Sequence, residues 1–447
     1  MINQKIIVIG GGESGCGAAL LAKQKGYDVF LSDKNVISKK YKKILKKNSI
    51  KWEECGHNID EFKNANEVVK SPGINEKSLI IKKLIKLDIK IISEIDFALR
   101  FTNSKIIAVT GSNGKTTTTK LIEHIFKKAK YRVKSVGNIG TGFCMQLFKK
   151  EYEYYILELS SFQLRDSSCL KPYISIILNI TKDHIEDHGS FDNYINSKLR
   201  IFQNQDNTNH FVFNSEDDFI SNIIDKKKIK SNKYSFSSKN EYHRKNHSFF
   251  GESKIQLLTN QNQLTMNINQ LALQGKHNIY NSMAASIAAK IMNIENNIIR
   301  ESLRDFKNLE HRLENFIKVY GIDFINDSKA TNVNSTWYAF ESINKPIVWI
   351  AGGVDKGNDY GILKDLAKTK VKALICLGKD NTKLKTEFKK HIKIIHECDS
   401  MKSAVEMSFQ LASFGDAVLL SPACASFDLY NNFEDRGNDF KREVKNA

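Results

Sequence analysis

A ten-residue stretch in the first third of the chain constrains the fold more than any other part of it. Residues 108–117 read A-V-T-G-S-N-G-K-T-T, which is the end of an apolar strand, a glycine loop and the start of a helix. Such a loop lets backbone N–H groups converge on phosphate oxygens, and the helix start adds positive charge. Lys115 supplies a further charge, and the Thr116 hydroxyl is suited to Mg²⁺. We predict a triphosphate-binding loop made of Gly111, Ser112, Asn113, Gly114, Lys115, Thr116 and Thr117.

This loop is shorter than the common G-x-x-x-x-G-K-[ST] pattern, because Val109 stands at the first glycine position. A glycine turn with a chance lysine is the alternative, and the strand before and helix after the loop argue against it. An earlier loop, residues 10–15, reads G-G-G-E-S-G after an apolar strand, and Asp33 follows the next strand. Taken literally this is a dinucleotide fingerprint. We favour phosphate binding there, with NAD as the less favoured ligand and an NAD-dependent dehydrogenase as a distant alternative.

The chain has 447 residues, too many for one hydrophobic core, since single cores stop growing near about 250–300 residues. Apolar runs alternate with amphipathic segments in three successive series, a pattern typical of βαβ units. We expect an α/β protein of three domains: a Rossmann-like N-terminal domain (1–94), a central P-loop ATPase-like α/β domain (95–305) and a C-terminal Rossmann-like α/β domain (306–447). Expected strands include 6–9, 106–109, 155–159, 174–179, 316–325, 347–351 and 417–420. Residues 226–262 are polar and fit a disordered insert or an antiparallel sheet, and Phe249, Phe250, Ile255 and Leu257 favour short strands.

Composition excludes several classes of protein. No apolar run approaches the roughly 18 residues of a spanning helix, and the N-terminal residues lack a signal cleavage site, so we expect a cytoplasmic protein with no membrane insertion. The net charge is +18, but lysine is dispersed and only ten of the 68 basic residues are arginine, which favours a solvated surface over nucleic-acid binding. The seven cysteines form no C-x-x-C pair, which argues against zinc or a redox dithiol.

Acidic residues follow two further strands of the central series. Glu158 ends the run before S-S-F-Q, and L-N-I-T-K-D-H places Asp183 and His184 after another strand. Open α/β sheets bind ligands at the carboxyl ends of their strands. Oxygen-rich coordination of Mg²⁺ fits these residues better than zinc, although each residue alone reads as a surface acid or helix cap.

The order of the motifs resembles that of the Mur ligase family over nearly the whole chain. The matching segments are V-T-G-S-N-G-K-T-T, E-L-S-S-F-Q-L, L-N-I-T-K-D-H, G-K-H-N-I-Y-N, H-R-L-E, N-D-S-K-A-T-N and S-P-A-C-A-S-F-D. The last two point to the glutamate-adding branch of the family. The resemblance implies ATP-dependent addition of D-glutamate to UDP-N-acetylmuramoyl-L-alanine through an acyl phosphate, in peptidoglycan precursor synthesis. It also implies two Mg²⁺ ions and small-molecule substrates only, and we expect a monomer. A folylpolyglutamate synthase-like ligase is the nearest alternative.

The resemblance also implies roles for individual residues. The catalytic residues would be Lys115, His184 and Lys198, with Lys198 as a carbamylated lysine. The Mg²⁺ ligands would be Thr116, Glu158, His184 and Lys198. Besides the glycine loop, ATP would contact Asn278, Asn281, Arg312, Asp327 and Lys329. The UDP-sugar would contact Ser14, Asp33, Ser71, Pro72, Gly73 and Asn138, and D-glutamate would contact Thr331, Lys356, Ser426 and Phe433. Glu13 departs from this picture, since an acid beside a diphosphate is unfavourable unless it points away.

Overall fold

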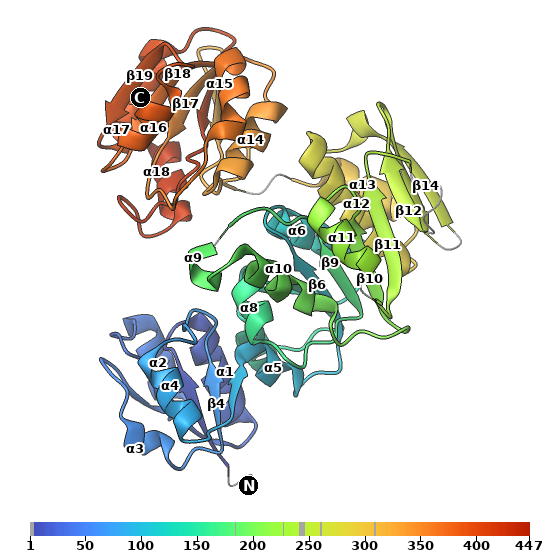
Figure 1. Ribbon diagram of the computed structural model, residues 1–447, viewed down its shortest axis with the longest axis vertical. Coiled ribbons are helices and arrows are strands. Elements are labelled where there is room, and N and C mark those ends of the chain that lie inside the picture. The colour runs from blue at the N-terminus through green and yellow to red at the C-terminus, as the bar shows by residue number, and fades with distance from the viewer. Residues whose placement is uncertain (1–3, 184, 227, 241–245, 260–261, 308–309) are drawn as a thin grey trace. The chain divides into compact units, whose positions relative to one another are not determined.

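Three β-sheets with flanking helices make up the computed structural model (Figure 1). The structure describes residues 4–183, 185–226, 228–240, 246–259, 262–307 and 310–447. Two compact units divide the chain: the first is Met1–Gln270 with Tyr280–Arg304, and the second is Leu271–Ile279 with Asp305–Ala447. Among the described residues, no helix is both long and apolar enough to cross a membrane.

The first sheet is fully parallel, with the strand order β3-β2-β1-β4-β5 of a Rossmann-like half. Buried apolar runs form its central strands, as expected of parallel strands covered on both faces. Its strands are β1 (Lys5–Ile9), β2 (Asp28–Ser32), β3 (Lys51–Glu53), β4 (Glu67–Lys70) and β5 (Ile91–Ser93). Its helices are α1 (Glu13–Gln24), α2 (Lys39–Lys47), α3 (Ile59–Phe62), α4 (Leu79–Lys86) and α5 (Glu94–Leu99).

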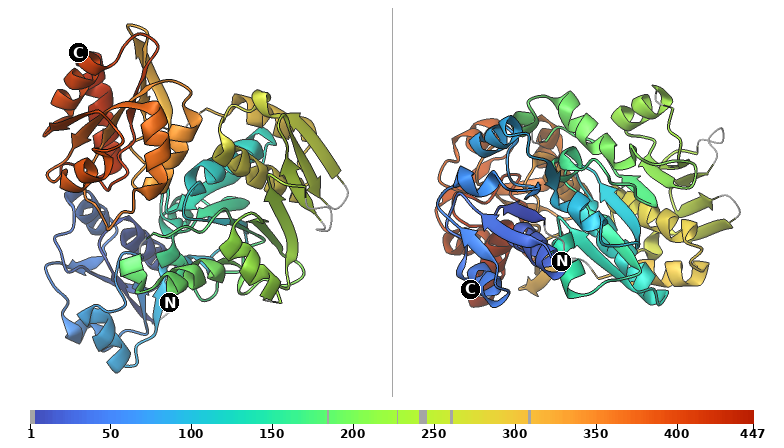
Figure 2. Two further views of the ribbon diagram at one scale, coloured as in Figure 1. Left: turned by 45° about the horizontal axis from the view of Figure 1, so that its top comes forward. Right: turned by 90° about the horizontal axis from the view of Figure 1, so that it is seen from below.

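The second sheet has nine strands in the order β14-β13-β12-β11-β10-β9-β6-β8-β7. It is parallel from β7 to β12 and antiparallel beyond, and the strands β11 to β14 form one edge (Figure 2). The strands are β6 (Lys105–Thr110), β7 (Val133–Gly137), β8 (Tyr154–Glu158), β9 (Ile174–Ile177), β10 (His210–Asn214), β11 (Asn232–Ser237), β12 (His247–Phe250), β13 (Lys254–Thr259) and β14 (Asn262–Asn267). The helices are α6 (Lys115–Lys128), α7 (Phe143–Lys149), α8 (Ser161–Asp166), α9 (Ile185–His188), α10 (Phe191–Leu199), η1 (Arg200–Phe202), α11 (Asp218–Lys226), η2 (Ile268–Gln270), α12 (Lys276–Ile291) and α13 (Asn296–Asp305).

The third sheet has the order β15-β16-β20-β17-β18-β19 and is parallel except for β15. In β17, Ile347 and Trp349 face α14 to α16, while Val348 and Ile350 face α17 and α18. The strands are β15 (Glu314–Val319), β16 (Ile322–Asn326), β17 (Ile347–Ala351), β18 (Val371–Leu377), β19 (Ile394–Cys398) and β20 (Ala417–Leu420). The helices are α14 (Val333–Ser342), η3 (Gly361–Leu363), α15 (Lys364–Lys370), α16 (Thr382–Phe388), α17 (Met401–Leu411) and α18 (Phe433–Asn446).

One of the expected segments differs from the structure. Residues 316–325, expected as one strand, form a hairpin that turns at Tyr320–Gly321, where both residues have positive φ. The polar stretch 226–262 contributes the short strands β11 to β13, of which β12 and β13 pair antiparallel and β11 and β12 pair parallel. Buried Phe236, Ile255 and Leu257 explain why this polar segment folds, because they give its strands an apolar face.

Candidate active site

The glycine loop connects β6 to α6, as its sequence predicts. Gly114 is the residue before α6 and has φ +82°, in the left-handed region that glycine adopts without strain. A Cβ atom there would lie 2.3 Å from Asn281 Oδ1, so glycine is also required for space. Lys115 Nζ donates to the carbonyl oxygens of Gly111 and Ser112, each at 2.8 Å. The side chains of Thr116 and Thr117 lie buried in the first turn of α6.

The segment after β9 holds the glycine loop in place. Asn179 accepts the Asn113 N–H at its Oδ1 at 2.8 Å, and its backbone oxygen accepts the Ser112 N–H at 2.9 Å. Ser112 Oγ accepts the Thr181 N–H at 2.9 Å and lies 2.8 Å from the Tyr194 hydroxyl. Part of the L-N-I-T-K-D-H motif therefore shapes the loop.

Lys198 lies beneath the same loop with its side chain 1% exposed. Its Nζ donates to Gly111 O at 2.8 Å and sits 4.7 Å from the centre of the Tyr194 ring. Burial holds the pKa of Lys198 well below its usual range, the charge of Lys115 lowers it further, and Asp183 opposes the shift. Two lysine nitrogens thus donate to one carbonyl oxygen, and burial favours the uncharged form of the Lys198 amine.

Glu158 ends β8 directly beside β6, in register with Val109. Its side chain is 2% exposed, and Oε2 has no hydrogen-bond partner among the described residues. Its Oε1 accepts from Asn138 Nδ2 at 3.2 Å, so the structure brings these two predicted site residues together. A buried carboxylate oxygen without a donor suits a divalent cation.

The rest of the predicted metal set is less complete. His184 lies outside the described residues. Among the residues that are described, no group of three or more His, Cys, Asp or Glu side chains is arranged to hold a metal ion. A cation at Glu158 would therefore need further oxygen ligands, such as the hydroxyl of Thr116 or phosphate oxygens.

Predicted contacts of the first domain meet at the carboxyl edge of its sheet. Asp33 Oδ2 accepts the Gly11 N–H at 2.5 Å, which ties the acid to the glycine loop. A Cβ on Gly10 would lie 2.6 Å from Ser71 Oγ, and that hydroxyl is buried without a partner among the described residues. Pro72 and Gly73 follow in a turn that the Ile74 N–H closes onto Ser71 O at 3.1 Å. Ser14 lies in the first turn of α1.

The two asparagines of the G-K-H-N-I-Y-N motif lie in α12 and have different surroundings. Asn281 accepts from Thr118 Oγ1 at 3.2 Å and lies against Gly114, so it contacts both the glycine loop and α6. Asn278 donates from Nδ2 to Gln274 O at 2.8 Å, on the exposed first turn.

In the second unit, Asp327 follows β16 and is buried. Its Oδ1 accepts the Leu313 N–H at 3.1 Å, and its Oδ2 accepts from Ser421 Oγ at 2.9 Å. Burial raises the pKa of Asp327 to about 7, against the lowering effect of these hydrogen bonds and of Arg312 and Arg436. The charge of Arg312 thus acts on the Asp327 carboxylate.

The predicted amino-acid contacts lie on neighbouring loops of the third sheet. Lys329 Nζ is 4.8 Å from the centre of the Phe433 ring, which brings these two together. Ser426 is buried, and the loop that precedes it pairs with Val354 through an isolated β-bridge to Ala425. Lys356 and Thr331 are exposed on adjoining loops. The Thr331 N–H donates to Lys329 O at 2.9 Å, which joins these two predicted residues through the backbone.

Arg436 is a residue that the motifs do not single out. It lies in α18, is 2% exposed, and donates to Ser328 Oγ and O at 3.1 and 2.9 Å. It also donates to Cys424 O at 3.2 Å and to Gly352 O at 3.4 Å. One guanidinium therefore joins the three loops that carry Lys329, Lys356 and Ser426. The sequence signal for Arg436 was the rarity of arginine in this lysine-rich chain. Only a planar guanidinium can donate to so many acceptors at once.

We expect Arg436→Lys to lower the Tm of the second unit by roughly 5–10 °C. An ammonium donates from one point and leaves some of these buried carbonyls unsatisfied, at on the order of 1–3 kcal/mol each. Differential scanning calorimetry measures the shift. Arg442→Lys is the matched control, since Arg442 lies in the same helix with its side chain 65% exposed. Equal Tm values for the two variants would contradict the role given to Arg436.

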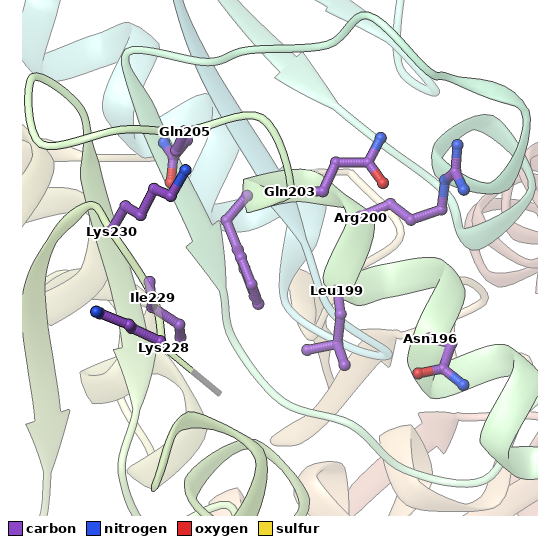
Figure 3. Close-up of a pocket in the computed structure, with 9 residues that line it drawn as sticks. Asn196, Leu199, Arg200, Gln203, Gln205, Lys228, Ile229 and Lys230 are labelled. Atoms are coloured by element: carbon purple, nitrogen blue, oxygen red, sulfur yellow. The ribbon is translucent and has the colours of Figure 1, made fainter. Parts of the chain in front are cut away.

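A separate cavity of about 280 Å³ lies beside α10 and η1 (Figure 3). None of the predicted site residues lines it. Its basic rim includes Arg200, whose guanidinium donates to Leu164 O and Ser167 O at 3.0 and 2.8 Å. The guanidinium of Arg200 is therefore bonded to backbone carbonyl oxygens. The cavity is distinct from the predicted site. Its lining residues are Asn196, Leu199, Arg200, Phe202, Gln203, Gln205, Lys228, Ile229 and Lys230.

Three family models match consecutive parts of the chain. They are described as the MurD N-terminal domain (residues 5–80), the Mur ligase middle domain (109–289) and the Mur ligase, glutamate ligase domain (311–424). Each covers most of one of the three sheets, although β5 and the first part of β6 lie between the first two matches.

Relatives match over the full length. A protein of Christiangramia forsetii is 45% identical over 446 residues, which are 100% of this chain and 100% of the relative. A Bacteroides fragilis protein is 46% identical over 445 residues, 99% of each chain. Both are named UDP-N-acetylmuramoylalanine–D-glutamate ligase.

Solved structures share the fold at low identity. MurC of Thermotoga maritima, a UDP-N-acetylmuramate-alanine ligase, has a TM-score of 0.64 at 18% identity and covers 99% of this chain and 100% of its own. MurF of the same organism, solved in complex with ADP, has a TM-score of 0.62 at 15% identity and covers 96% of this chain and 99% of its own. With its three α/β sheets, its family matches and its full-length relatives, the chain belongs to the Mur ligase family.

Proposed function

We propose that the chain is an ATP-dependent ligase that joins D-glutamate to UDP-N-acetylmuramoyl-L-alanine and releases ADP and phosphate. The name and full length of its relatives support this reaction. The structural observation that carries it is the glycine loop before α6 next to Glu158, whose buried Oε2 has no hydrogen-bond partner in the part of the chain that the structure describes. A phosphate-binding loop next to an oxygen ligand for a cation is what phosphoryl transfer from ATP needs.

The chemistry explains why a nucleotide is required. A carboxylate is a poor electrophile, so its oxygen first attacks the γ-phosphorus of ATP and ADP leaves. The amine of D-glutamate then attacks the acyl-phosphate carbon, phosphate leaves, and the amine loses a proton. Lys115 and the loop N–H groups would hold the β- and γ-phosphates, and Thr116 with Glu158 would hold Mg²⁺. Bound Mg²⁺ would offset the negative charge of the phosphates and of the developing oxyanion.

In this scheme, the side chain of Lys198 would be carbamylated. The deprotonated form of the amine, which burial favours, can attack CO₂, forming an N–C bond and releasing one proton, and the product is an anionic oxygen ligand. Together with His184, it would hold a second Mg²⁺. The support from this chain is the burial of Nζ beside Gly111 O and the lowered pKa of the amine.

The remaining predicted residues would bind the three substrates. Asn278, Asn281, Arg312, Asp327 and Lys329 would contact ATP, with Asp327 on the ribose. Ser14, Asp33, Ser71, Pro72 and Gly73 would surround the uridine diphosphate, and Asn138 the muramoyl group. Thr331, Lys356, Ser426 and Phe433 would bind D-glutamate, because a lysine and a hydroxyl suit a side-chain carboxylate. We propose that the protein does this as a cytoplasmic monomer.

A phosphate-release assay tests the reaction. We expect Mg²⁺-dependent release from ATP only when UDP-N-acetylmuramoyl-L-alanine and D-glutamate are both present. L-glutamate in place of D-glutamate, and L-glutamate with folate, are the comparison arms. No D-glutamate-dependent release would refute the substrate assignment, and release with folate would favour a folylpolyglutamate synthase-like activity.

A further inference from the structure

Glu94 is a buried carboxylate that the proposed reaction leaves without a role. It begins α5, is 1% exposed, and lies in a segment between the two matched family domains, which end at residue 80 and begin at residue 109. Buried carboxylates are costly unless their oxygens are bonded, so such a residue calls for a structural or functional reason.

The carboxylate caps a helix of the second sheet. Its Oε1 accepts the Cys144 N–H at 2.6 Å in the first turn of α7, and the Cys144 thiol donates back to Glu94 O at 3.3 Å. Gly142, the residue before α7, offers no side-chain cap of its own. Glu94 therefore supplies the acceptor that the free N–H groups of this helix need.

The capped helix follows the loop that carries Asn138. This loop, residues 137–142, returns through a Val136–Thr141 bridge, and Asn138 donates from its side chain to Glu158 and from its N–H to Glu158 O at 2.8 Å. A shift of α7 would therefore move Asn138, whereas Glu158 stays fixed in β8 through its pairing with β6 and β7.

The start of α7 also lies against the glycine loop of the first sheet. A Cβ on Gly142 would lie 3.5 Å from Ser14 Cα, 3.7 Å from Ser14 Oγ and 3.7 Å from Glu94 Oε1. Nearby, a Cβ on Gly17 would lie 2.6 Å from Met145 N, so α1 and α7 are in close backbone contact. α1, α5 and α7 pack together, and Figure 1 shows α1 and α5 side by side. Glu94 thus stands where the two loops meet.

The charge of Glu94 is finely balanced. Burial raises its pKa to about 7, the hydrogen bonds from Cys144 and Phe143 lower it, and the charge of Glu13 raises it. The titratable groups facing it are Glu13 on α1 and Cys144 on α7, and on its own helix Asp96 faces Ser168 instead. The hydrogen bonds from the start of α7 favour the ionised carboxylate, whereas burial and the charge of Glu13 oppose it.

We propose that Glu94 is a positioning residue that holds the loop of Asn138 against the loop of Ser14, and so sets the span of the site for the nucleotide-sugar. This rests on the proposed function, in which the two loops bind opposite ends of one substrate. Because the substrate must reach from one loop to the other, a change in their separation weakens its binding while the loop for ATP is untouched.

Steady-state kinetics of Glu94→Ala, Glu94→Gln and Asp96→Ala test the proposal. For Glu94→Ala we expect the KM for UDP-N-acetylmuramoyl-L-alanine to rise about tenfold or more, with the KM for ATP within about twofold of wild type. Glutamine keeps an acceptor for the Cys144 N–H, so Glu94→Gln should restore the KM to within about threefold. Asp96→Ala is the matched control, since Asp96 is an equally buried carboxylate of α5 that bonds Ser168 at 2.7 Å and touches neither loop.

The pH dependence of the Tm provides a second readout. It compares wild type with Glu94→Gln, so it does not depend on whether the alanine variant folds. The folded pKa of Glu94, about 7, lies above the ordinary value of 4.5. The group's contribution to stability is therefore fully present below pH 4.5 and is lost as the pH rises through 7. Glutamine does not titrate, so the Tm of Glu94→Gln minus that of wild type should increase between pH 5 and pH 8.

The outcomes separate the two proposals. Equal KM values for the nucleotide-sugar in Glu94→Ala and Asp96→Ala, or a parallel rise in the KM for ATP, would overturn the positioning role while wild-type turnover still supports the ligase. A Tm difference that does not change with pH would also count against it. If the wild-type enzyme shows no D-glutamate-dependent turnover, the result would instead contradict the proposed function itself.

Discussion

Lys115→Ala should reduce ATP-dependent turnover by about 10³-fold or more. Lys115 starts α6 and directs its ammonium onto the loop carbonyls of Gly111 and Ser112, where the phosphates of ATP are proposed to bind. Removing a charge that stabilises a transferring phosphoryl group costs on the order of 10²–10³ in kcat, and weaker ATP binding adds to the loss. Phosphate release at saturating UDP-N-acetylmuramoyl-L-alanine and D-glutamate measures it.

Lys127→Ala is the matched control for this variant. Lys127 lies in the last turn of the same helix, with its side chain 58% exposed and ion-paired to Glu123. Its removal should leave kcat within about twofold, since exposed ion pairs contribute little. Activity of Lys115→Ala within tenfold of wild type would contradict phosphate binding by this loop.

Lys198→Ala should lose about 10³-fold in kcat and recover part of it with a small carboxylic acid. The side chain of alanine leaves a cavity beside Gly111, where Nζ lay buried, and acetate or formate can place an anionic oxygen there. We expect at least about tenfold rescue in kcat, which is a gain of roughly 1.4 kcal/mol. Wild-type protein labelled with ¹³CO₂ should show a carbamate signal that the variant lacks.

Two comparisons make the rescue specific. Lys115→Ala should not recover with acetate, because it lacks a cation and not an anion. Lys198→Arg should stay inactive, since a guanidinium cannot form the carbamate at neutral pH. Failure of every acid to restore Lys198→Ala, together with no carbamate signal in wild type, would leave Lys198 as a buried structural lysine.

Much of the fold followed from local patterns. The apolar runs 6–9, 106–109 and 347–351 became central parallel strands, because strands buried on both faces must be continuously apolar. The three-domain α/β class and the Mur ligase family, predicted from the motifs, are confirmed by the family matches. The hairpin at Tyr320 was missed, because positive φ at a non-glycine residue has no strong sequence signal.

Motifs were less informative about what each residue does. In E-L-S-S-F-Q-L, the side chains of Ser160 and Gln163 form a capping box for α8, so part of this motif is structural. No motif singles out Tyr194, yet its hydroxyl lies 2.8 Å from Ser112 Oγ and its ring centre lies 4.7 Å from Lys198 Nζ. The roles of the predicted site residues, including His184, stay predictions.

By itself, the sequence determined that this chain forms three α/β domains, that one glycine loop suits a triphosphate, and to which family the chain belongs. Those features are local, since they depend on spacing within a dozen residues and on the order of short motifs. Only the tertiary structure decided that Lys115 and Lys198 share one carbonyl oxygen, that Arg436 joins three loops, and that Glu94 caps a helix of another sheet. Those depend on burial and on contacts between residues far apart in the chain, which set hydrogen bonding and pKa and leave no local pattern.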